Sequence, residues 1–473
     1  MLEDLGLKCL MISGSRRVDL SVEHHAFGTI RLPGAYILRE ELEKNNIDVE
    51  IVDFITFFEG EDLKRLSSVA KQYYPDFITV SNTFLQYDDL FNITRHLKSI
   101  LPDRPIIVGG MDPTTIDEYT VDYSVYGYGE NALIKVLEHY FLNNDLEFKY
   151  SGRTKIVDAI HSYPSWPKED YNYEYRKEDH IGKNEIGTLE FSRGCRFKCK
   201  FCNFPILGIP QDTSQKDIQK SVDQLNRNYD QFGITNYIMA DETFNDRLEK
   251  LDKLVQIQNK LDFEAKFSAF CRLDLVWSYP EQIDMMIESK LVGQHYGIET
   301  FNLKAAKIIG KGKQAEIAKE TLLKVKSKFQ EAEVDWWPSV SMIVGLPHST
   351  PSECIESHEW LKEYYNGHIV WYPLEISTSG ANLSAFGENM ADYGFEIAGK
   401  DIMTPTKKLK STMWKSKDWT YNEAYELSKQ LNDRNWYRVS WYAGYAGITT
   451  EEKQSIPYEY IKHRLPELEE KYG

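Results

Sequence analysis

Three cysteines with the spacing C-x3-C-x2-C, at Cys195, Cys199 and Cys202, constrain the fold of this chain more than any other feature. They follow a short strand-like run and an Arg-Gly turn, in a chain with only six cysteines. Thiolates are soft ligands, and a tight loop can present three of them to one face of an iron–sulfur cubane. Three ligands would leave the fourth iron open to a substrate molecule. Zinc is an alternative, but it takes a fourth protein ligand, and no Cys or His follows at zinc-finger spacing. A purely structural trio of thiols is the weakest alternative.

These residues resemble the radical S-adenosylmethionine superfamily, in which a C-x3-C-x2-C loop binds a [4Fe–4S] cluster. Phe201 stands where the family places an aromatic residue before the third cysteine. The resemblance implies that Cys195, Cys199 and Cys202 are the cluster ligands. It also implies that S-adenosylmethionine chelates the open iron and is cleaved to a 5′-deoxyadenosyl radical, with an electron from a donor such as flavodoxin or ferredoxin.

Composition predicts a soluble protein of two or three domains. The chain has 473 residues, of which 42% are hydrophobic and 27% charged. It has no apolar run of about twenty residues, so no membrane span is expected, and its acidic first four residues do not resemble a secretory signal. Cys9, Cys271 and Cys354 are scattered, which favours a reducing, cytoplasmic location. The net charge of −17 disfavours nucleic acid as a partner.

The N-terminal part predicts an α/β domain. Short apolar runs alternate with helical patterns, and the runs lie at 7–13, 49–53, 77–81, 105–110 and 123–126. This pattern indicates a doubly wound parallel sheet of the Rossmann type over residues 1–150. Ligands of such sheets bind at the carboxyl ends of the strands. The residues expected at those ends are Ser81, Thr83, Gly109, Gly110, Gly127, Gly129 and Glu130.

This domain resembles the cobalamin-binding-like domain of one large radical S-adenosylmethionine class. The similar segments are Pro33-Gly34, Val52-Asp53, Ser81-Asn82-Thr83, Gly109 to Pro113 and Gly127 to Glu130. The resemblance implies that the strand-end residues named above bind cobalamin, with glycines letting the backbone approach its nucleotide tail. Some members of the class keep this fold without binding cobalamin, so the resemblance leaves open whether this domain binds it.

A histidine ligand to cobalt is not expected. Proteins with such a ligand carry Asp-x-His-x-x-Gly, and the nearest match here is Glu23-x-His25-x-x-Gly28. Glutamate replaces the aspartate, and the segment lies away from the end of the first strand. We therefore interpret His25 as an ordinary loop histidine, with a cobalt ligand as the alternative.

The rest of the chain predicts a linker, a partial barrel and a C-terminal region. Residues 151–186 lose periodicity and are expected to be a linker that packs across both domains. Residues 187–384 contain six strand–helix units, which the resemblance implies form a six-unit partial (β/α) barrel with its chemistry at the carboxyl strand ends. Residues 385–473 are aromatic-rich and mostly helical by pattern. They either close the open side of the barrel and help to select the substrate, or simply pack as a terminal subdomain.

The resemblance also implies an S-adenosylmethionine site along the barrel strands. Asp241 and Glu242 would receive the methionine amine, although such acidic pairs also cap helices. Ser268 and Arg272 lie on the next strand, where the arginine would bind the methionine carboxylate with two parallel hydrogen bonds.

Two later segments complete this expected site. Glu299 ends Tyr296-Gly297-Ile298-Glu299, which is similar to the Gly-Ile-Glu of the class. Val344 and Gly345 lie in a segment similar to Ile-x-Gly-Leu-Pro, expected to line the adenine. The sixth strand departs from the class, because Glu375 to Leu383 replaces the usual Pro-Gly-Thr-Pro. The substrate therefore cannot be carried over from relatives.

Together these features predict a cobalamin-dependent radical S-adenosylmethionine methyltransferase acting on a small molecule or peptide. An oxidative cyclisation or rearrangement without methyl transfer is the alternative, and an iron–sulfur redox sensor is a third reading. Methylthio transfer is disfavoured, because the N-terminal domain contains only Cys9 and cannot ligate a second cluster.

Overall fold

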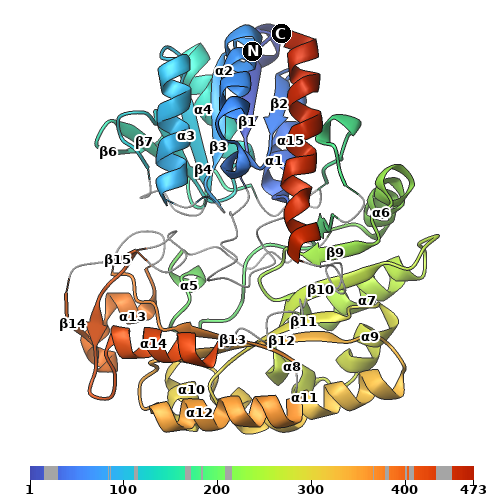
Figure 1. Cartoon of the computed structure of the whole chain (residues 1–473), viewed down its shortest axis with the longest axis vertical. Coiled ribbons are helices and arrows are strands. Elements are labelled where there is room, and N and C mark those ends of the chain that lie inside the picture. Colours follow the sequence, from blue (N-terminus) through green and yellow to red (C-terminus); the bar gives the residue numbers. More distant parts are fainter. Residues whose placement is uncertain are drawn as a thin grey trace. The chain divides into compact units, whose positions relative to one another are not determined.

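The computed structural model divides the chain into two compact units (Figure 1). Unit 1 comprises Met1–Glu185, Pro405–Leu409 and Thr450–Gly473, and unit 2 comprises Ile186–Thr404 and Lys410–Thr449. The structure describes residues 1–14, 30–83, 85, 87–110, 116–165, 172–182, 185–207, 216–365, 367–378, 383–399, 402–403, 410–432 and 450–472.

Unit 1 is built on a seven-stranded sheet with the order β2-β1-β3-β4-β5-β7-β6. Its strands are β1 (Lys8–Ile12), β2 (Asp48–Val52), β3 (Phe77–Ser81), β4 (Ile106–Gly110), β5 (Tyr123–Tyr126), β6 (Lys149–Ser151) and β7 (Thr154–Asp158). All pairings are parallel except that of β6 with β7. Helices α1 (Pro33–Glu43), α2 (Glu61–Tyr73), α3 (Tyr87–Ile100) and α4 (Glu130–Leu142) connect the strands. The strands are apolar and mostly buried, as in a sheet covered on both faces, and the predicted doubly wound domain is confirmed.

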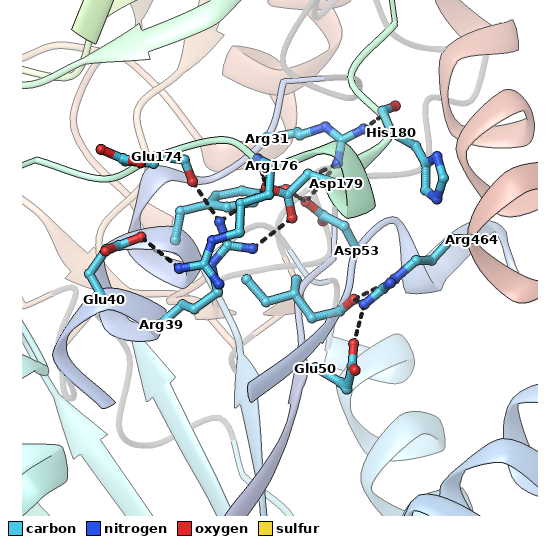
Figure 2. A network of polar contacts seen from close by, with 12 residues as sticks. Arg31, Arg39, Glu40, Glu50, Asp53, Glu174, Arg176, Asp179, His180 and Arg464 are labelled. Carbon is cyan, nitrogen blue, oxygen red and sulfur yellow. Dashed lines mark hydrogen bonds and ion pairs between the residues drawn. The ribbon is translucent and has the colours of Figure 1, made fainter. Parts of the chain in front are cut away.

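The segment predicted as a linker belongs instead to unit 1. The β6–β7 hairpin extends the sheet beyond β5. Farther along, Arg39 donates two hydrogen bonds to Asp179, at 2.8 and 3.0 Å, as Figure 2 shows. Arg31 donates two to Glu185, at 2.5 and 2.8 Å. These four side chains are buried. Separating such a pair would leave a buried charge without its partner, so the segment is fixed to α1.

The last helix, α15 (Thr450–Tyr472), also belongs to unit 1. It lies along β2, the edge strand of the sheet (Figure 1). The Tyr460 hydroxyl accepts a hydrogen bond from the Asp53 amide at 2.9 Å. Arg464 donates to the Ile51 carbonyl at 3.1 Å and to the Glu50 carboxylate at 2.6 Å (Figure 2). The helix thus satisfies backbone groups that an edge strand leaves open. The single subdomain predicted over 385–473 is therefore divided between the two units.

Unit 2 contains a six-stranded, all-parallel sheet with the order β13-β12-β11-β10-β9-β8. Its strands are β8 (Gly187–Leu189), β9 (Asn236–Met239), β10 (Lys266–Cys271), β11 (Gly293–Glu299), β12 (Trp337–Val344) and β13 (His368–Pro373). The main connecting helices are α6 (Ile218–Phe232), α7 (Leu248–Gln258), α9 (Gln282–Glu288), α11 (Gly312–Glu331) and α12 (Pro351–Trp360). Strand order follows chain order, as in a barrel that does not close, and the predicted six-unit partial barrel is confirmed.

Residues 410–432 cover the free edge of β13. Asn432, which follows α14 (Tyr421–Leu431), accepts from the Trp371 amide at 2.8 Å and donates to its carbonyl at 2.7 Å. The Trp414 indole donates to the Leu374 carbonyl at 2.9 Å. This contact of Trp414 agrees with both expectations for the C-terminal aromatics, closure of this side of the barrel and plain packing. Trp436 and Trp441 lie outside the described residues. In the part of the chain that the structure describes, no helix is long and apolar enough to cross a membrane.

Candidate functional site

The cysteine loop follows β8, and Asp241 at the end of β9 fixes its first residues. One carboxylate oxygen accepts from the Phe191 amide at 2.9 Å. The other accepts from the amide and the hydroxyl of Ser192, at 3.0 and 2.8 Å. Asp241 is buried, and both of its oxygens already have partners within the protein. The structure therefore favours a positioning role over the predicted contact with a methionine amine.

A buried lysine, Lys250, stabilises the same loop through its contacts with Asp241 and Thr243. The Lys250 ammonium lies 3.0 Å from Asp241 and 3.0 Å from Asp246, and it donates to the Thr243 carbonyl at 3.3 Å. Burial alone lowers the pKa of Lys250, but the two carboxylates outweigh it and the pKa is raised. The Thr243 hydroxyl in turn lies 3.6 Å from the Cys195 sulfur. Lys250 thus holds in place both the aspartate that fixes the loop and the threonine that contacts its first cysteine.

Arg272, just after β10, contacts the second cysteine. One of its terminal nitrogens donates to the Cys199 sulfur at 3.6 Å, and its guanidinium stacks 3.9 Å from the Phe197 ring centre. Its Nε and its other terminal nitrogen donate to the two Asp274 carboxylate oxygens, at 3.0 and 2.7 Å. The Asn245 side chain holds the Arg272 backbone, accepting from its amide at 2.8 Å and donating to its carbonyl at 3.0 Å. The structure therefore places the arginine fork on Asp274, which differs from the predicted pairing with a methionine carboxylate.

The three cysteines are free thiols on one short loop. Cys199 is buried, while Cys195 and Cys202 are half-buried. Burial raises the pKa of Cys202 to about 11, so this thiol stays protonated until a positive group binds it. Among the described residues, no three His, Cys, Asp or Glu side chains converge on a site for one metal ion. In a [4Fe–4S] cubane each cysteine binds a different iron, so the three thiols of the loop need not converge on one point. Three soft donors beside the Arg272 cation fit an anionic iron–sulfur cluster.

Glu299 ends β11 in a strained conformation and lies next to this loop. Its φ is +69°, which is uncommon for a residue other than glycine and often marks a functional site. Lys311 donates to its carboxylate at 2.9 Å and to the Gly297 carbonyl at 2.7 Å. The same ammonium lies 5.7 Å from the Phe201 ring centre. A Cβ at position 297 would lie 2.4 Å from the Glu299 carboxylate, which explains the glycine.

Of the other predicted barrel residues, Glu242, Val344 and Gly345 lie at carboxyl strand ends, whereas Ser268 lies within β10. Glu242 follows β9 and is half-buried, whereas Ser268 on β10 and Val344 on β12 are buried. Gly345 has a φ of +94°, and a Cβ there would lie 2.7 Å from the Trp414 ring. Its glycine is therefore explained by packing of the C-terminal segment. The sheet brings the predicted residues other than Ser268 to one edge, from β9 to β12 in order.

In unit 1, the chain's own packing explains two of the predicted cofactor glycines. Gly110 has a φ of +152°, and a Cβ there would lie 1.7 Å from the Asn82 side-chain oxygen. Gly127 has a φ of +106°, and its Cβ would lie 2.7 Å from the Ile160 side chain. Gly109 differs, because among the described residues only the Val125 carbonyl, at 4.0 Å, comes near its Cβ position. Within the described part of the chain, the backbone face is therefore open at Gly109 but not at Gly110 or Gly127.

Polar groups gather at the carboxyl ends of the central strands of unit 1. Ser81 lies opposite Gly109 in the sheet, and both Ser81 and Thr83 are half-buried. Ser13, directly after β1, is fully buried, and its hydroxyl has no hydrogen-bond partner among the residues described. A buried hydroxyl without a partner is costly, so this edge fits a polar ligand. Gly129 and the buried Glu130 begin α4 at the same edge. His25, the alternative cobalt ligand, lies outside the described residues.

Glu375, just after β13, is a candidate that the sequence reasoning did not assign. Burial raises its pKa to about 7. On α14, the Tyr421 hydroxyl is buried and has no partner within the described ranges. Burial raises the pKa of Tyr421, and the Glu375 charge raises it further. A carboxyl group that ionises near neutral pH therefore ends the sixth strand, at the edge expected to shape the substrate pocket.

We expect Glu375→Gln to stabilise the protein at high pH only. The folded-state pKa, about 7, exceeds the ordinary value of 4.5, so the fold favours the protonated acid. The contribution of Glu375 to the free energy of unfolding should therefore fall as pH rises from 4.5 to 7 and then level off. The variant should match wild type near pH 4.5 and exceed it by about 1–2 kcal/mol at pH 8. Urea unfolding at both pH values measures this difference, with the exposed Glu388→Gln as the control. A difference independent of pH would contradict the raised pKa.

Comparison with known families and curated proteins finds similarity to radical enzymes and methyltransferases. Residues 189–361 match the Radical SAM superfamily. The chain is 23% identical to the uncharacterized methyltransferase PH0819 of Pyrococcus horikoshii, covering 69% of this chain and 72% of that protein. It is 22% identical to the hopanoid C-2 methylase of Rhodopseudomonas palustris, covering 50% of this chain and 44% of that protein. It is 21% identical to the anaerobic magnesium-protoporphyrin IX monomethyl ester cyclase of Cereibacter sphaeroides, covering 72% of this chain and 56% of that protein. The chain thus spans about half the length of the last two proteins.

Solved structures share the whole fold. The radical S-adenosylmethionine methyltransferase TsrM from Kitasatospora setae, with cobalamin and a [4Fe–4S] cluster bound, superposes with a TM-score of 0.66. That likeness covers 99% of this chain and 100% of TsrM at 13% identity. The cobalamin-dependent radical enzyme OxsB gives a TM-score of 0.57 at 17% identity, over 90% of this chain and 61% of OxsB.

Proposed function

Because the chain carries a domain of the radical S-adenosylmethionine superfamily over residues 189–361, we propose that it is a cobalamin-dependent methyltransferase of that superfamily. The substrate class is a small molecule or peptide. The observation that carries this proposal is the likeness to TsrM, which covers 99% of this chain and thus both units. TsrM binds cobalamin and a [4Fe–4S] cluster, and in a second structure it binds tryptophan and a S-adenosylmethionine analogue.

In this proposal the cysteine loop of unit 2 holds the cluster. When bound, the cluster and S-adenosylmethionine supply a 5′-deoxyadenosyl radical, and cobalamin supplies the methyl group. Cys195, Cys199 and Cys202 are the ligands. Thr243 and Arg272 lie 3.6 Å from two of the sulfurs and stabilise negative charge there.

The remaining site residues are proposed to bind the two organic cofactors. Glu242, Glu299, Val344 and Gly345 would hold S-adenosylmethionine at the carboxyl ends of the barrel strands, and Ser268 would contribute from within β10. Asp241 and Arg272 act through the cysteine loop. In unit 1, Ser13, Ser81, Thr83 and Gly109 would contact cobalamin, while Gly110, Gly127, Gly129 and Glu130 shape the backbone around it. We propose that cobalt has no histidine ligand.

We expect Glu299→Gln to weaken S-adenosylmethionine binding about tenfold, which is typical for the loss of one charge-assisted hydrogen bond. Glutamine keeps the shape of the side chain and still accepts from Lys311, which is 2.9 Å away in the wild type. The iron content should therefore stay unchanged. Equilibrium dialysis of the cluster-loaded variant measures the affinity. An affinity equal to wild type would remove Glu299 from the binding site.

Label transfer tests the proposed reaction. The cluster-loaded protein is incubated with hydroxocobalamin, a chemical reductant and S-adenosylmethionine labelled in its methyl group, with tryptophan as the first candidate substrate. We expect the label to appear in cobalamin even without the correct substrate, and in the product with it. Formation of 5′-deoxyadenosine with no label transfer would contradict methyl transfer. Absence of both reactions would favour a redox sensor.

A second candidate is a radical cyclisation or rearrangement without methyl transfer. It is supported by the similarity to the magnesium-protoporphyrin IX monomethyl ester cyclase, which covers 72% of this chain. Both candidates need an electron from outside the chain, and we propose a flavodoxin or a ferredoxin as its source.

A further inference from the structure

A row of three polar side chains crosses three strands of the partial barrel. The Ser339 hydroxyl on β12 lies 3.1 Å from Nδ1 of His295 on β11 and 2.9 Å from Nδ1 of His368 on β13. The three residues are level with one another in the sheet, because His295 pairs with Ser339, and Ser339 with His368, in the strand register. We call these three residues the histidine row.

The histidine row faces the inside of the barrel. Neighbouring residues of a strand point to opposite faces of the sheet. Gln294 accepts a hydrogen bond from the Trp336 indole at 2.9 Å, and the Trp336 ring stacks on Phe329 of α11. Gln294 therefore lies on the side that the helices cover, and His295 lies on the barrel side. Barrel interiors are usually filled by branched apolar side chains, so polar groups there are typical of a binding site.

The histidine row lies close to the cysteine loop. His295 pairs in the register with Phe270 on β10, and the two rings meet edge to face, with their centres 5.2 Å apart. Arg272, which contacts the Cys199 sulfur, follows Phe270 by two residues and so faces the same side. A strand rises about 3.3 Å per residue, so the row is about 7 Å from the level of Arg272. A molecule bound at the row is therefore near the proposed cluster.

His295 is the accessible end of the row. It is half-buried, whereas Ser339 and His368 are buried. A serine hydroxyl has one proton, so when Ser339 donates to His368, it accepts from the Nδ1–H of His295. This arrangement supports a positively charged His295, since a charged imidazole needs an acceptor for each N–H. The six barrel strands are described throughout, and their only acidic residue is Glu299, four residues beyond His295. The row thus suits a ligand of negative charge.

We propose that His295 binds a carboxylate group of the substrate, with Ser339 and His368 as positioning residues behind it. The inference rests on the proposed function and deepens it, because it assigns the substrate to molecules that carry a carboxylate. A charged imidazole and a carboxylate form a charge-assisted hydrogen bond, which is stronger than one between neutral groups. The Phe270 ring and the Ser339 hydroxyl hold the imidazole from two sides, so little freedom is lost when the ligand binds.

Fluorine NMR with two matched small probes tests this site. Fluoroacetate carries a carboxylate, and fluoroacetamide has nearly the same shape without the charge. Each probe is titrated with the cluster-loaded full chain, and broadening of the probe signal gives its affinity. We expect fluoroacetate to bind at least about tenfold more tightly than fluoroacetamide, and acetate to displace it. His295→Gln should remove this preference. His161→Gln, at an exposed histidine of unit 1, is the control and should keep it.

The positioning role of Ser339 is tested by a pair of variants. Ser339→Ala removes the hydroxyl and should weaken fluoroacetate binding about tenfold, since His295 loses the acceptor at 3.1 Å. Ser339→Thr keeps a hydroxyl and should retain most of the affinity.

The outcomes separate this inference from the proposed function. Equal affinity of the wild type for the two probes would overturn the carboxylate site, and so would a preference that survives in His295→Gln. Equal losses in Ser339→Ala and Ser339→Thr would overturn the positioning role of the hydroxyl. The titrations contain neither S-adenosylmethionine nor cobalamin. A protein that prefers fluoroacetate but never transfers a labelled methyl group would therefore overturn the proposed function and leave the carboxylate site standing.

Discussion

Replacing Cys199 with alanine is expected to remove the visible absorbance of the iron–sulfur cluster and to bring S-adenosylmethionine cleavage below detection. The variant keeps only two of the three proposed thiolate ligands, on a loop whose geometry is fixed by Asp241 and Lys250. Iron and sulfide analysis, the absorbance spectrum and 5′-deoxyadenosine formation measure the effect.

Cys271→Ala is the matched control. Cys271 is a buried thiol on β10 whose pKa is raised by burial, as expected for a structural cysteine. This variant should retain both the cluster and the activity. Equal losses in the two variants would mean that the ligands are assigned wrongly.

The second large effect concerns Lys250, and we expect Lys250→Met to lower the free energy of unfolding by about 3–5 kcal/mol. Methionine fills a similar volume but leaves Asp241, which is buried, without the cation that lies 3.0 Å away in the wild type. The same substitution removes the ammonium that pairs with Asp246. Because Asp241 holds the first residues of the cysteine loop, cluster loading should fall as well.

Urea unfolding of the cluster-free protein measures the stability part of this effect. Lys260→Met, at an exposed position just after α7, should change the free energy of unfolding by less than about 0.5 kcal/mol. Adding Asp241→Asn to Lys250→Met should restore part of the stability, since a neutral amide no longer needs the cation. If Lys250→Met lowered the free energy of unfolding by less than about 1 kcal/mol, the buried network would not depend on its lysine.

The sequence predicted both sheets because their signals are local. Each parallel strand is a short apolar run followed by a helical pattern, and the cysteine spacing identifies the loop within eight residues. The partners of individual side chains could not be predicted in this way. The sequence shows which residue follows a strand, but it does not show which groups that residue contacts. Arg272 was predicted on the third barrel strand and lies directly after it, yet its guanidinium binds Asp274, only two residues farther along.

Contacts between distant segments could not be predicted from the sequence. Arg464 binds Glu50 across 414 residues of chain, and no periodicity links α15 to the edge of β2. Gly110 and Gly127 were predicted to approach a cofactor, but Asn82 and Ile160 occupy the space beside them. A glycine in the sequence can indicate that the space beside the backbone must stay free of a side chain. It does not indicate whether a ligand or another part of the chain occupies that space.

Cofactor content tests the central claim most directly. The protein is reconstituted anaerobically with iron and sulfide, mixed with hydroxocobalamin and freed of excess reagents before iron and cobalamin are counted. We predict about four irons and about one cobalamin per chain, with a cobalamin spectrum that does not change in His25→Ala. A full complement of iron without retained cobalamin would contradict the methyltransferase and leave unit 1 as a scaffold for a radical reaction of another kind.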